Sequence, residues 1–191
     1  MTQFVLASGS ARRALLLQSS GYTFTVDSPD VDESPLPGED PLTMVERLAL
    51  EKARHVARRH PGLVVLAADT TVVLDGKSVG KPVDIDDARR MLHSLMGRTH
   101  VVATGVAVVT GDSSTGFVDS STVHMSSLSD DDLEAYLATG ESLDKAGAYA
   151  LQGEARNFID RIDGLKSTVI GLPLPLVVAA LDELGIPRNT M

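Results

Sequence analysis

Residues 63–74 read LVVLAADTTVVL, the most hydrophobic strand-like stretch of the chain. Its length and its content of β-branched residues are typical of a buried β-strand, and the sequence DGKS at residues 75–78 predicts a hairpin turn after it. Asp69 lies inside this stretch, where an unpaired buried carboxylate would be costly. We therefore expect Asp69 to be paired with a cation, to bind a metal or to have a raised pKa. The simpler alternative is an aspartate that caps a strand end or a turn.

Helical and strand patterns alternate along the rest of the chain. Helices are predicted by apolar residues at helical spacing, and strands by runs of β-branched residues. The predicted strands are residues 3–7, 22–26, 63–74, 99–110, 117–127 and 158–162. The predicted helices are residues 11–19, 41 to about 60, 84–97, 129–140 and 173–184, and loops are expected at 27–40 and 141–157. This order predicts one α/β or α+β domain over residues 1–191, with a mixed sheet.

The composition limits the classes of function. The sequence contains no cysteine, which excludes disulfides, thiolate metal sites and cysteine nucleophiles. Its formal net charge of -9 argues against sequence-independent binding to nucleic acid. No stretch has the pattern of a membrane span or a secretory signal, so we expect a cytoplasmic protein. An anionic ligand would need a local basic patch or a divalent cation.

Such a basic patch is predicted at residues 7–13, ASGSARR, which join the first strand to the first helix. The helix N-terminus would face a ligand together with the hydroxyls of Ser8 and Ser10 and the guanidinium groups of Arg12 and Arg13. We interpret this joint as an anion site. The simpler alternative is that Ser10 only caps the helix and that the arginines are solvated, although cations there oppose the helix dipole.

Two lysines and two acids extend this set. Lys52 falls on the apolar stripe of the helix predicted from residue 41, and the simpler alternative is a lysine that snorkels to water from the edge of the stripe. Lys81 follows the predicted hairpin in the sequence GKP. Glu33 and Asp69 are candidate metal ligands. Together these cations and carboxylates match what a magnesium-bound polyphosphate requires.

Several motifs resemble the Maf family of nucleoside triphosphate pyrophosphatases, which are relatives of the inosine triphosphate pyrophosphatases. They occur in the family's order between residues 5 and 177. They read LASGSARRALL, VDES, LALEKA, AADTTVVLDG, VGKP, DDARRMLHSLMGRTHVVATGVAV, YLATGESLDKAGAYALQG and GLPLPLV.

The resemblance implies an elongated α/β fold, with a central mixed sheet flanked by helices and two lobes around a cleft. It also implies cleavage of a nucleoside triphosphate between the α and β phosphates, with Mg²⁺ or Mn²⁺ held by Glu33 and Asp69, and Asp69 as the general base. A homodimer is implied as well, and the strand at 117–127 is a candidate for pairing. The residues that resemble the family's phosphate-contacting set are Ser8, Ser10, Arg13, Lys52 and Lys81.

Three further positions point to a branch of the family. Arg12, Thr70 and Gln152 match the branch that acts on dTTP and UTP, and a neutral amide suits the edge of uracil or thymine. Ala11 departs from the proline that is usual in the family. Two other functions stay open: hydrolysis of 7-methyl-GTP or another modified nucleotide, and a regulatory binding role in septum formation.

Overall fold

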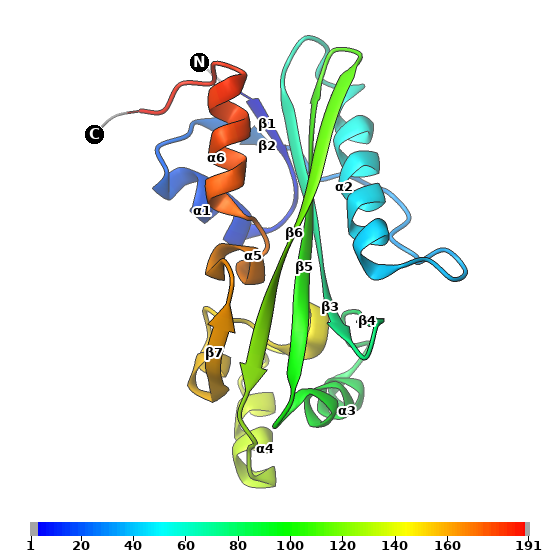
Figure 1. Ribbon diagram of the computed structural model, residues 1–191, viewed down its shortest axis with the longest axis vertical. Coiled ribbons are helices and arrows are strands. Elements are labelled where there is room, and N and C mark those ends of the chain that lie inside the picture. The colour runs from blue at the N-terminus through cyan, green and yellow to red at the C-terminus, as the bar shows by residue number, and fades with distance from the viewer. Residues whose placement is uncertain (1–3, 190–191) are drawn as a thin grey trace.

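The computed structural model describes residues 4–189. Within them, seven strands form one mixed sheet in the order β2-β1-β3-β5-β6-β7, and β4 pairs with β3. The pairs β1–β2 and β1–β3 are parallel and the others are antiparallel. Figure 1 shows an elongated molecule with helices along the sheet, so the predicted fold class is confirmed. The strands are β1 (Phe4–Ala7), β2 (Phe24–Val26), β3 (Val65–Leu74), β4 (Lys77–Val79), β5 (Thr99–Thr110), β6 (Ser113–Met125) and β7 (Ile159–Asp163).

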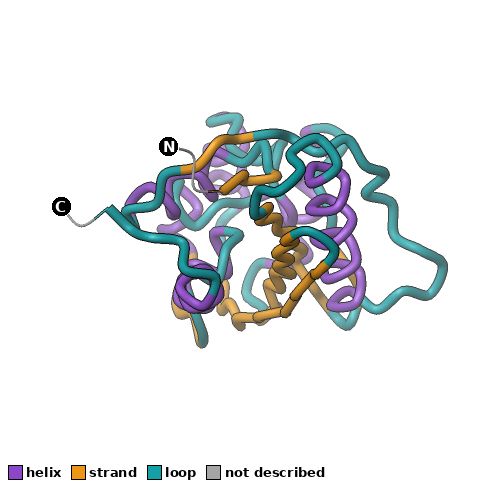
Figure 2. The backbone as a smooth tube through the Cα atoms, turned by 90° about the horizontal axis from the view of Figure 1, so that it is seen from above, coloured by secondary structure: helices purple, strands orange, loops and turns teal. Residues whose placement is uncertain are grey.

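Helices cover both faces of the sheet (Figure 2). Helix α2 packs on the face that carries Val65 and Ala67, whereas α1 and α6 pack on the face that carries Leu66 and Ala68. Helices α3 and α4 close a separate core at the other end of the long strands. The helices are α1 (Ala11–Ser19), α2 (Pro41–Ala57), α3 (Ile85–Leu95), α4 (Asp130–Ala138), α5 (Lys166–Ile170) and α6 (Leu174–Glu183). Among the described residues, none of the helices is both long enough and apolar enough to cross a membrane.

Most of these elements were predicted from the sequence, but several begin or end at other residues than predicted. Strand β2 begins two residues later than predicted, and α2 ends at Ala57 instead of near residue 60. Strand β6 begins at Ser113, although the sequence placed its start at 117. The loop predicted at 141–157 contains one short 3₁₀ helix and the start of another, and α5 was not predicted. Residue 3, where the first strand was expected to begin, lies outside the described residues.

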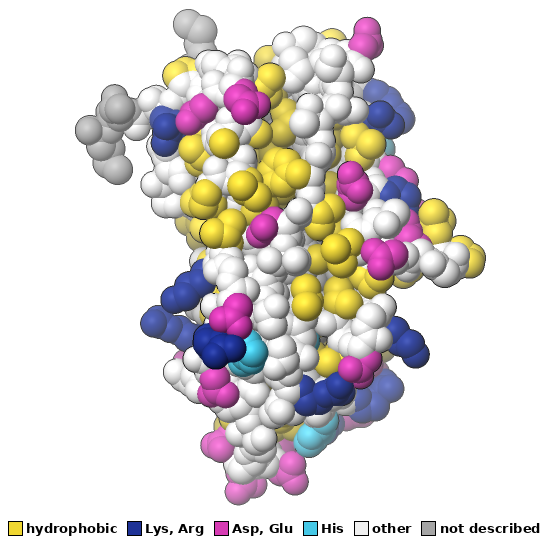
Figure 3. Space-filling view, in the orientation of Figure 1, with side chains coloured by type: hydrophobic (Ala, Val, Ile, Leu, Met, Phe, Trp, Pro, Cys, Tyr) yellow, Lys and Arg dark blue, Asp and Glu magenta, His cyan; other side chains and the backbone are white. Residues whose placement is uncertain are grey.

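The strand predicted at 117–127 as a candidate for pairing has a free edge, among the described strands, over only part of its length. Strand β7 pairs with residues 122–125 of β6, so these residues have neighbours on both sides. Residues 113–121 pair with β5 alone among the described strands. Figure 3 shows hydrophobic side chains gathered over α6 and the adjoining part of β6, in the upper half of the view.

A gap in strand pairing opens the edge of β3. Strand β1 pairs with β3 at residues 65–67, and β4 pairs with it at residues 72–74. Residues 68–71 therefore have no described strand partner on this edge. Because alternate side chains point to opposite faces, Asp69 faces α2 and Thr70 faces α1. The gap lets a ligand reach both side chains from one side.

Gly105 of β5 allows α2 to lie very close to the sheet. Gly105 is the register partner of Asp69 on β3. A Cβ atom at this position would lie 2.3 Å from the carbonyl oxygen of Val45 in α2. Because this is far inside van der Waals contact, the packing requires a glycine. The close approach also brings Lys52, on the same helix, to Asp69.

We predict that Gly105→Ala lowers the free energy of unfolding by about 1–3 kcal/mol, because the added methyl group overpacks the contact between α2 and β5. Urea unfolding followed by circular dichroism measures this change. Gly80→Ala is the control, because a Cβ at Gly80 meets no atom of residues 4–189 within 4 Å. Equal free energies of unfolding for the two variants would contradict the prediction.

Candidate active site

A cleft of about 810 Å³ lies at the gap in β3 pairing. Its walls come from the loop between β1 and α1, from residues 28–35, from α2, from the turn after β4 and from residues 144–152. All ten site residues predicted from the sequence line this cleft. They are Ser8, Ser10, Arg12, Arg13, Glu33, Lys52, Asp69, Thr70, Lys81 and Gln152.

The loop between β1 and α1 directs donors into the cleft. Ser8 is buried, and its Oγ accepts hydrogen bonds from the Ser10 amide at 3.2 Å and from Arg13 Nη1 at 3.1 Å. Both acceptor positions of the Ser8 hydroxyl are thus used, which leaves its proton for a ligand. Ser10 occupies the N-cap position of α1, but its side chain makes no capping hydrogen bond. The alternative that its hydroxyl serves as a helix cap is therefore wrong.

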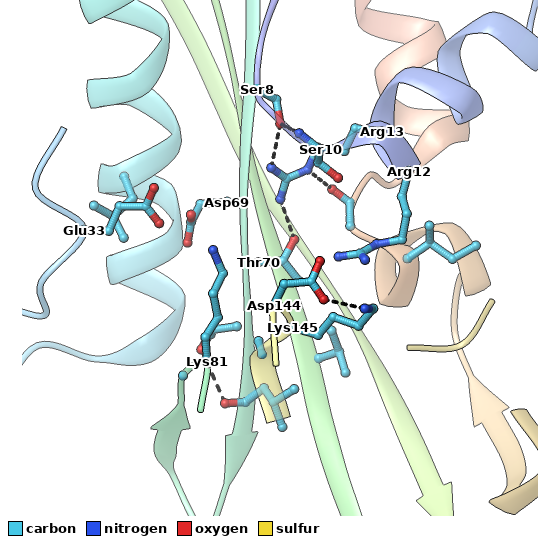
Figure 4. Close-up of a pocket in the computed structure, with 18 of the residues that line it drawn as sticks. Ser8, Ser10, Arg12, Arg13, Glu33, Asp69, Thr70, Lys81, Asp144 and Lys145 are labelled. Carbon is cyan, nitrogen blue, oxygen red and sulfur yellow. Dashed lines mark hydrogen bonds and ion pairs between the residues drawn. The ribbon is translucent and has the colours of Figure 1, made fainter. Parts of the chain in front are cut away.

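Arg13 is held by three protein acceptors (Figure 4). Its Nε donates to the carbonyl of Gly171 at 2.7 Å, Nη1 to Ser8, and Nη2 to Thr70 Oγ1 at 3.0 Å. Because a guanidinium has five N–H donors, two are left for a ligand. Burial lowers the pKa of Arg13 from its usual value, and the charge of Asp69 opposes this effect. The alternative of a solvated arginine in the first turn is wrong for Arg13.

Lys52 and Asp69 form a buried ion pair on the other side of β3. Lys52 is 6% exposed and Asp69 is 7% exposed. The Nζ atom of Lys52 lies 2.5 Å from Asp69 Oδ1 and 3.0 Å from Glu33 Oε1. The alternatives of a snorkelling Lys52 and of a capping Asp69 are therefore wrong. The ammonium group of Lys52 is thus a cation paired with Asp69, as expected for a carboxylate buried in this strand.

Residues 27–40 carry Glu33 and are fixed at both ends, at one end to the turn that follows α2 and at the other to α2 itself. Asp27 contacts Arg59 at 2.7 Å and His60 at 2.7 Å, and these hydrogen bonds lower the pKa of Asp27 to about 2. At the other end, Arg47 Nε lies 2.6 Å from Glu39, whose pKa its hydrogen bonds likewise lower to about 2. These two contacts hold the segment beside the cleft, with Glu33 between them.

The far wall contains a pair of charges that sequence analysis did not assign to the site. Figure 4 shows Lys81 pointing toward Asp69, and Asp144 and Lys145 lying across the cleft beside Arg12. The Nζ atom of Lys145 donates to Asp144 Oδ1 at 2.5 Å and to the carbonyl of Glu141 at 2.6 Å. The charges in the motif LDKAGAYALQG were the available signal for these residues.

Glu33 and Asp69 are suitable ligands for a hard divalent cation that is also bound to a phosphate group. Both carboxylates face the same ammonium group, and carboxylate oxygens are ligands that Mg²⁺ prefers. Within residues 4–189, no group of three histidine, cysteine or acidic side chains could hold a metal. Mg²⁺ is usually bound by one or two carboxylates, and phosphate oxygens of a ligand complete its coordination. Glu33 and Asp69 therefore suit an ion that arrives with a phosphate ligand.

The fold and the cleft define an α/β protein that gathers arginine, lysine and carboxylate side chains at the open edge of a mixed sheet. This is a suitable site for a polyanionic ligand. A sequence model of the family described as Maf-like protein matches residues 3–184, and the chain belongs to this family.

Individual relatives match over nearly the whole chain. A dTTP/UTP pyrophosphatase of Symbiobacterium thermophilum is 46% identical and aligns with 100% of this chain and 98% of its own length. A dTTP/UTP pyrophosphatase of Myxococcus xanthus is 47% identical, covering 97% of this chain and 94% of its own length. The solved structure of a HAM1 protein from Coxiella burnetii is 16% identical and covers 96% of this chain and 100% of its own, with a TM-score of 0.56. This last likeness concerns the fold alone.

We predict that Lys52→Met lowers the free energy of unfolding by about 3–5 kcal/mol, because it leaves Asp69 buried without its cation. Adding Asp69→Asn to this variant should restore much of the loss, because the uncompensated charge is then removed. Urea unfolding of both single variants and the double variant measures the coupling. Lys81→Met, at an exposed lysine of the same cleft, is the control and should change stability little. Equal losses in Lys52→Met and Lys81→Met would be inconsistent with this account.

Proposed function

We propose that the protein hydrolyses dTTP and UTP to the nucleoside monophosphate and pyrophosphate. The observation that carries the proposal is the buried Lys52–Asp69 pair, placed in one cleft with the anion-binding loop of Ser8, Ser10 and Arg13. The relatives named dTTP/UTP pyrophosphatase, similar over nearly the full length, support this choice of reaction.

The proposed reaction begins when a water molecule attacks the α phosphorus of the bound triphosphate. Asp69 accepts a proton from this water, while Lys52 fixes the orientation of the Asp69 carboxylate through Oδ1. The bond between the α phosphorus and the bridging oxygen breaks, and pyrophosphate leaves with the electron pair of that bond. Arg13 and Lys81 stabilise the charge on the leaving group, and the hydroxyl of Ser8 donates to a phosphate oxygen.

Glu33 and Asp69 would hold the divalent cation, which we propose to be Mg²⁺ or Mn²⁺. When bound with the triphosphate, such an ion supplies charge neutralisation and orients the phosphates. Glu33 is half-exposed, and the anchored segment 27–40 places its carboxylate 3.0 Å from Lys52. The two anchors at Asp27 and Glu39 therefore help to position the Glu33 carboxylate for the cation.

We propose that the nucleobase of the substrate is recognised at the other end of the cleft, near Arg12 and Gln152. The amide of Gln152 can both donate and accept, which suits the imide edge shared by uracil and thymine. Arg12 lies across from Asp144, whose pKa is lowered mainly by the hydrogen bond from Lys145. The cytoplasmic location and the homodimer stay predictions from the sequence.

We predict that Asp69→Asn lowers kcat for UTP and dTTP by about 10²–10⁴-fold, the usual contribution of a general base. The measurement is pyrophosphate release from a panel of triphosphates that includes UTP, dTTP and 7-methyl-GTP, with Mg²⁺. Asp75→Asn is the matched control, because Asp75 lies on the hairpin after β3 and pairs with Arg98 at the surface. Full activity of Asp69→Asn would overturn the role of Asp69. Preference for 7-methyl-GTP would favour the modified-nucleotide alternative, and no cleavage would favour the regulatory one.

A further inference from the structure

A row of threonines crosses the sheet behind Arg13. Thr70 on β3 is the register partner of Thr104 on β5, and Thr104 is the register partner of Asp119 on β6. Thr168 of α5 lies against this row. We call Thr70, Thr104 and Thr168 the threonine row. Thr104 and Thr168 are fully buried, and Thr104 does not line the cleft.

The hydrogen bonds of the threonine row have one direction. The Oγ1 of Thr104 donates its proton to the carbonyl of Thr168 at 2.9 Å. Because a hydroxyl has only one proton, Thr104 cannot also donate to Thr70, whose Oγ1 lies 2.9 Å away. Thr70 must therefore donate to Thr104. The far end of the row is closed by the Thr168 hydroxyl, which donates to Asp119.

This direction decides what Thr70 offers to the cleft. Its proton is used by Thr104, so a lone pair of Thr70 Oγ1 accepts from Arg13 Nη2 at 3.0 Å. A guanidinium has no acceptor, so a Thr70 proton turned toward Arg13 would repel it. Thr70 can accept the hydrogen bond from Arg13 because its own hydroxyl proton is donated to Thr104.

Resting on the proposed function, in which Arg13 contacts the triphosphate, we propose that Thr104 is a positioning residue for polyphosphate binding. It acts through Thr70 and fixes the plane of the Arg13 guanidinium together with Gly171 and Ser8. Thr70 accordingly contributes to binding through Arg13 and does not donate its hydroxyl proton to the nucleobase.

Thr104→Val tests this role, because valine keeps the shape of threonine and removes the acceptor. The carbonyl of Thr168 keeps a second donor, the Gly171 amide at 3.0 Å, so the substitution leaves no orphaned carbonyl. The probe is inorganic tripolyphosphate with Mg²⁺, and its Kd is measured by calorimetry. We expect the Kd to rise about tenfold in Thr104→Val, the size expected for one lost hydrogen bond. We expect Thr104→Ser, which restores the hydroxyl, to bind within about twofold of the wild type.

A second set of variants separates positioning from a general loss of structure. Thr70→Val should weaken binding as Thr104→Val does, and the double variant should bind no more weakly than Thr70→Val alone. Ser121→Ala is the control, because Ser121 is buried and donates to Leu165 at the start of α5, outside the threonine row. Its Kd should match the wild type.

The possible failures are distinguishable. If the wild type binds tripolyphosphate and Thr104→Val binds it equally well, the role of Thr104 is wrong and the proposed function stands. A Thr104→Ser variant as weak as Thr104→Val, or additive losses in the double variant, would also overturn the role. If the wild type does not bind tripolyphosphate, this inference fails, whereas pyrophosphate release from UTP and dTTP decides the proposed function separately.

Discussion

The rest of the structure depends on the contact between Lys52 and Asp69. Either of these charges would be costly to bury without the other. Asp69 can therefore lie in the most hydrophobic strand only because Lys52 of α2 places a cation beside it. Gly105 makes this possible, because it lets the backbone of α2 approach the sheet directly opposite Asp69. One contact therefore fixes both the packing of a helix and the orientation of the proposed general base.

The interrupted edge of β3 explains why two chemically different sets of residues meet in one cleft. Between the ends of β1 and β4, neighbouring residues of β3 point to opposite faces of the sheet. Asp69 meets the acidic and basic groups of α2 and residues 27–40. Thr70 contacts Arg13 and the next member of the threonine row, Thr104. A triphosphate lying across this edge would contact both sets, which is how a chain with a net charge of -9 can bind a polyanion locally.

Sequence patterns predicted the long elements and eight of the ten predicted site residues that line the cleft, whereas Thr70 and Gln152 were predicted from the family resemblance. The patterns failed where the deciding contacts are tertiary. Helix α5 spans only Lys166–Ile170, too short for helical periodicity to appear. The start of β6 is polar and exposed, so no hydrophobic alternation marks it. Lys52 looked compatible with snorkelling because its partner is 17 residues away in sequence. Thr104 has no sequence signal of function, since a threonine in a strand is ordinary and only its hydrogen-bond direction distinguishes it.

The central claim is that the triphosphate lies across the open edge of β3, between Arg13 and the Lys52–Asp69 pair. A crystal structure with Mg²⁺ and a UTP analogue that carries a methylene group between the α and β phosphorus atoms tests it most directly. The account predicts phosphate oxygens within about 3 Å of Arg13 and Lys81, with the α phosphorus facing Asp69. A triphosphate bound away from this edge, with Arg13 and Asp69 both without contact to it, would contradict the account.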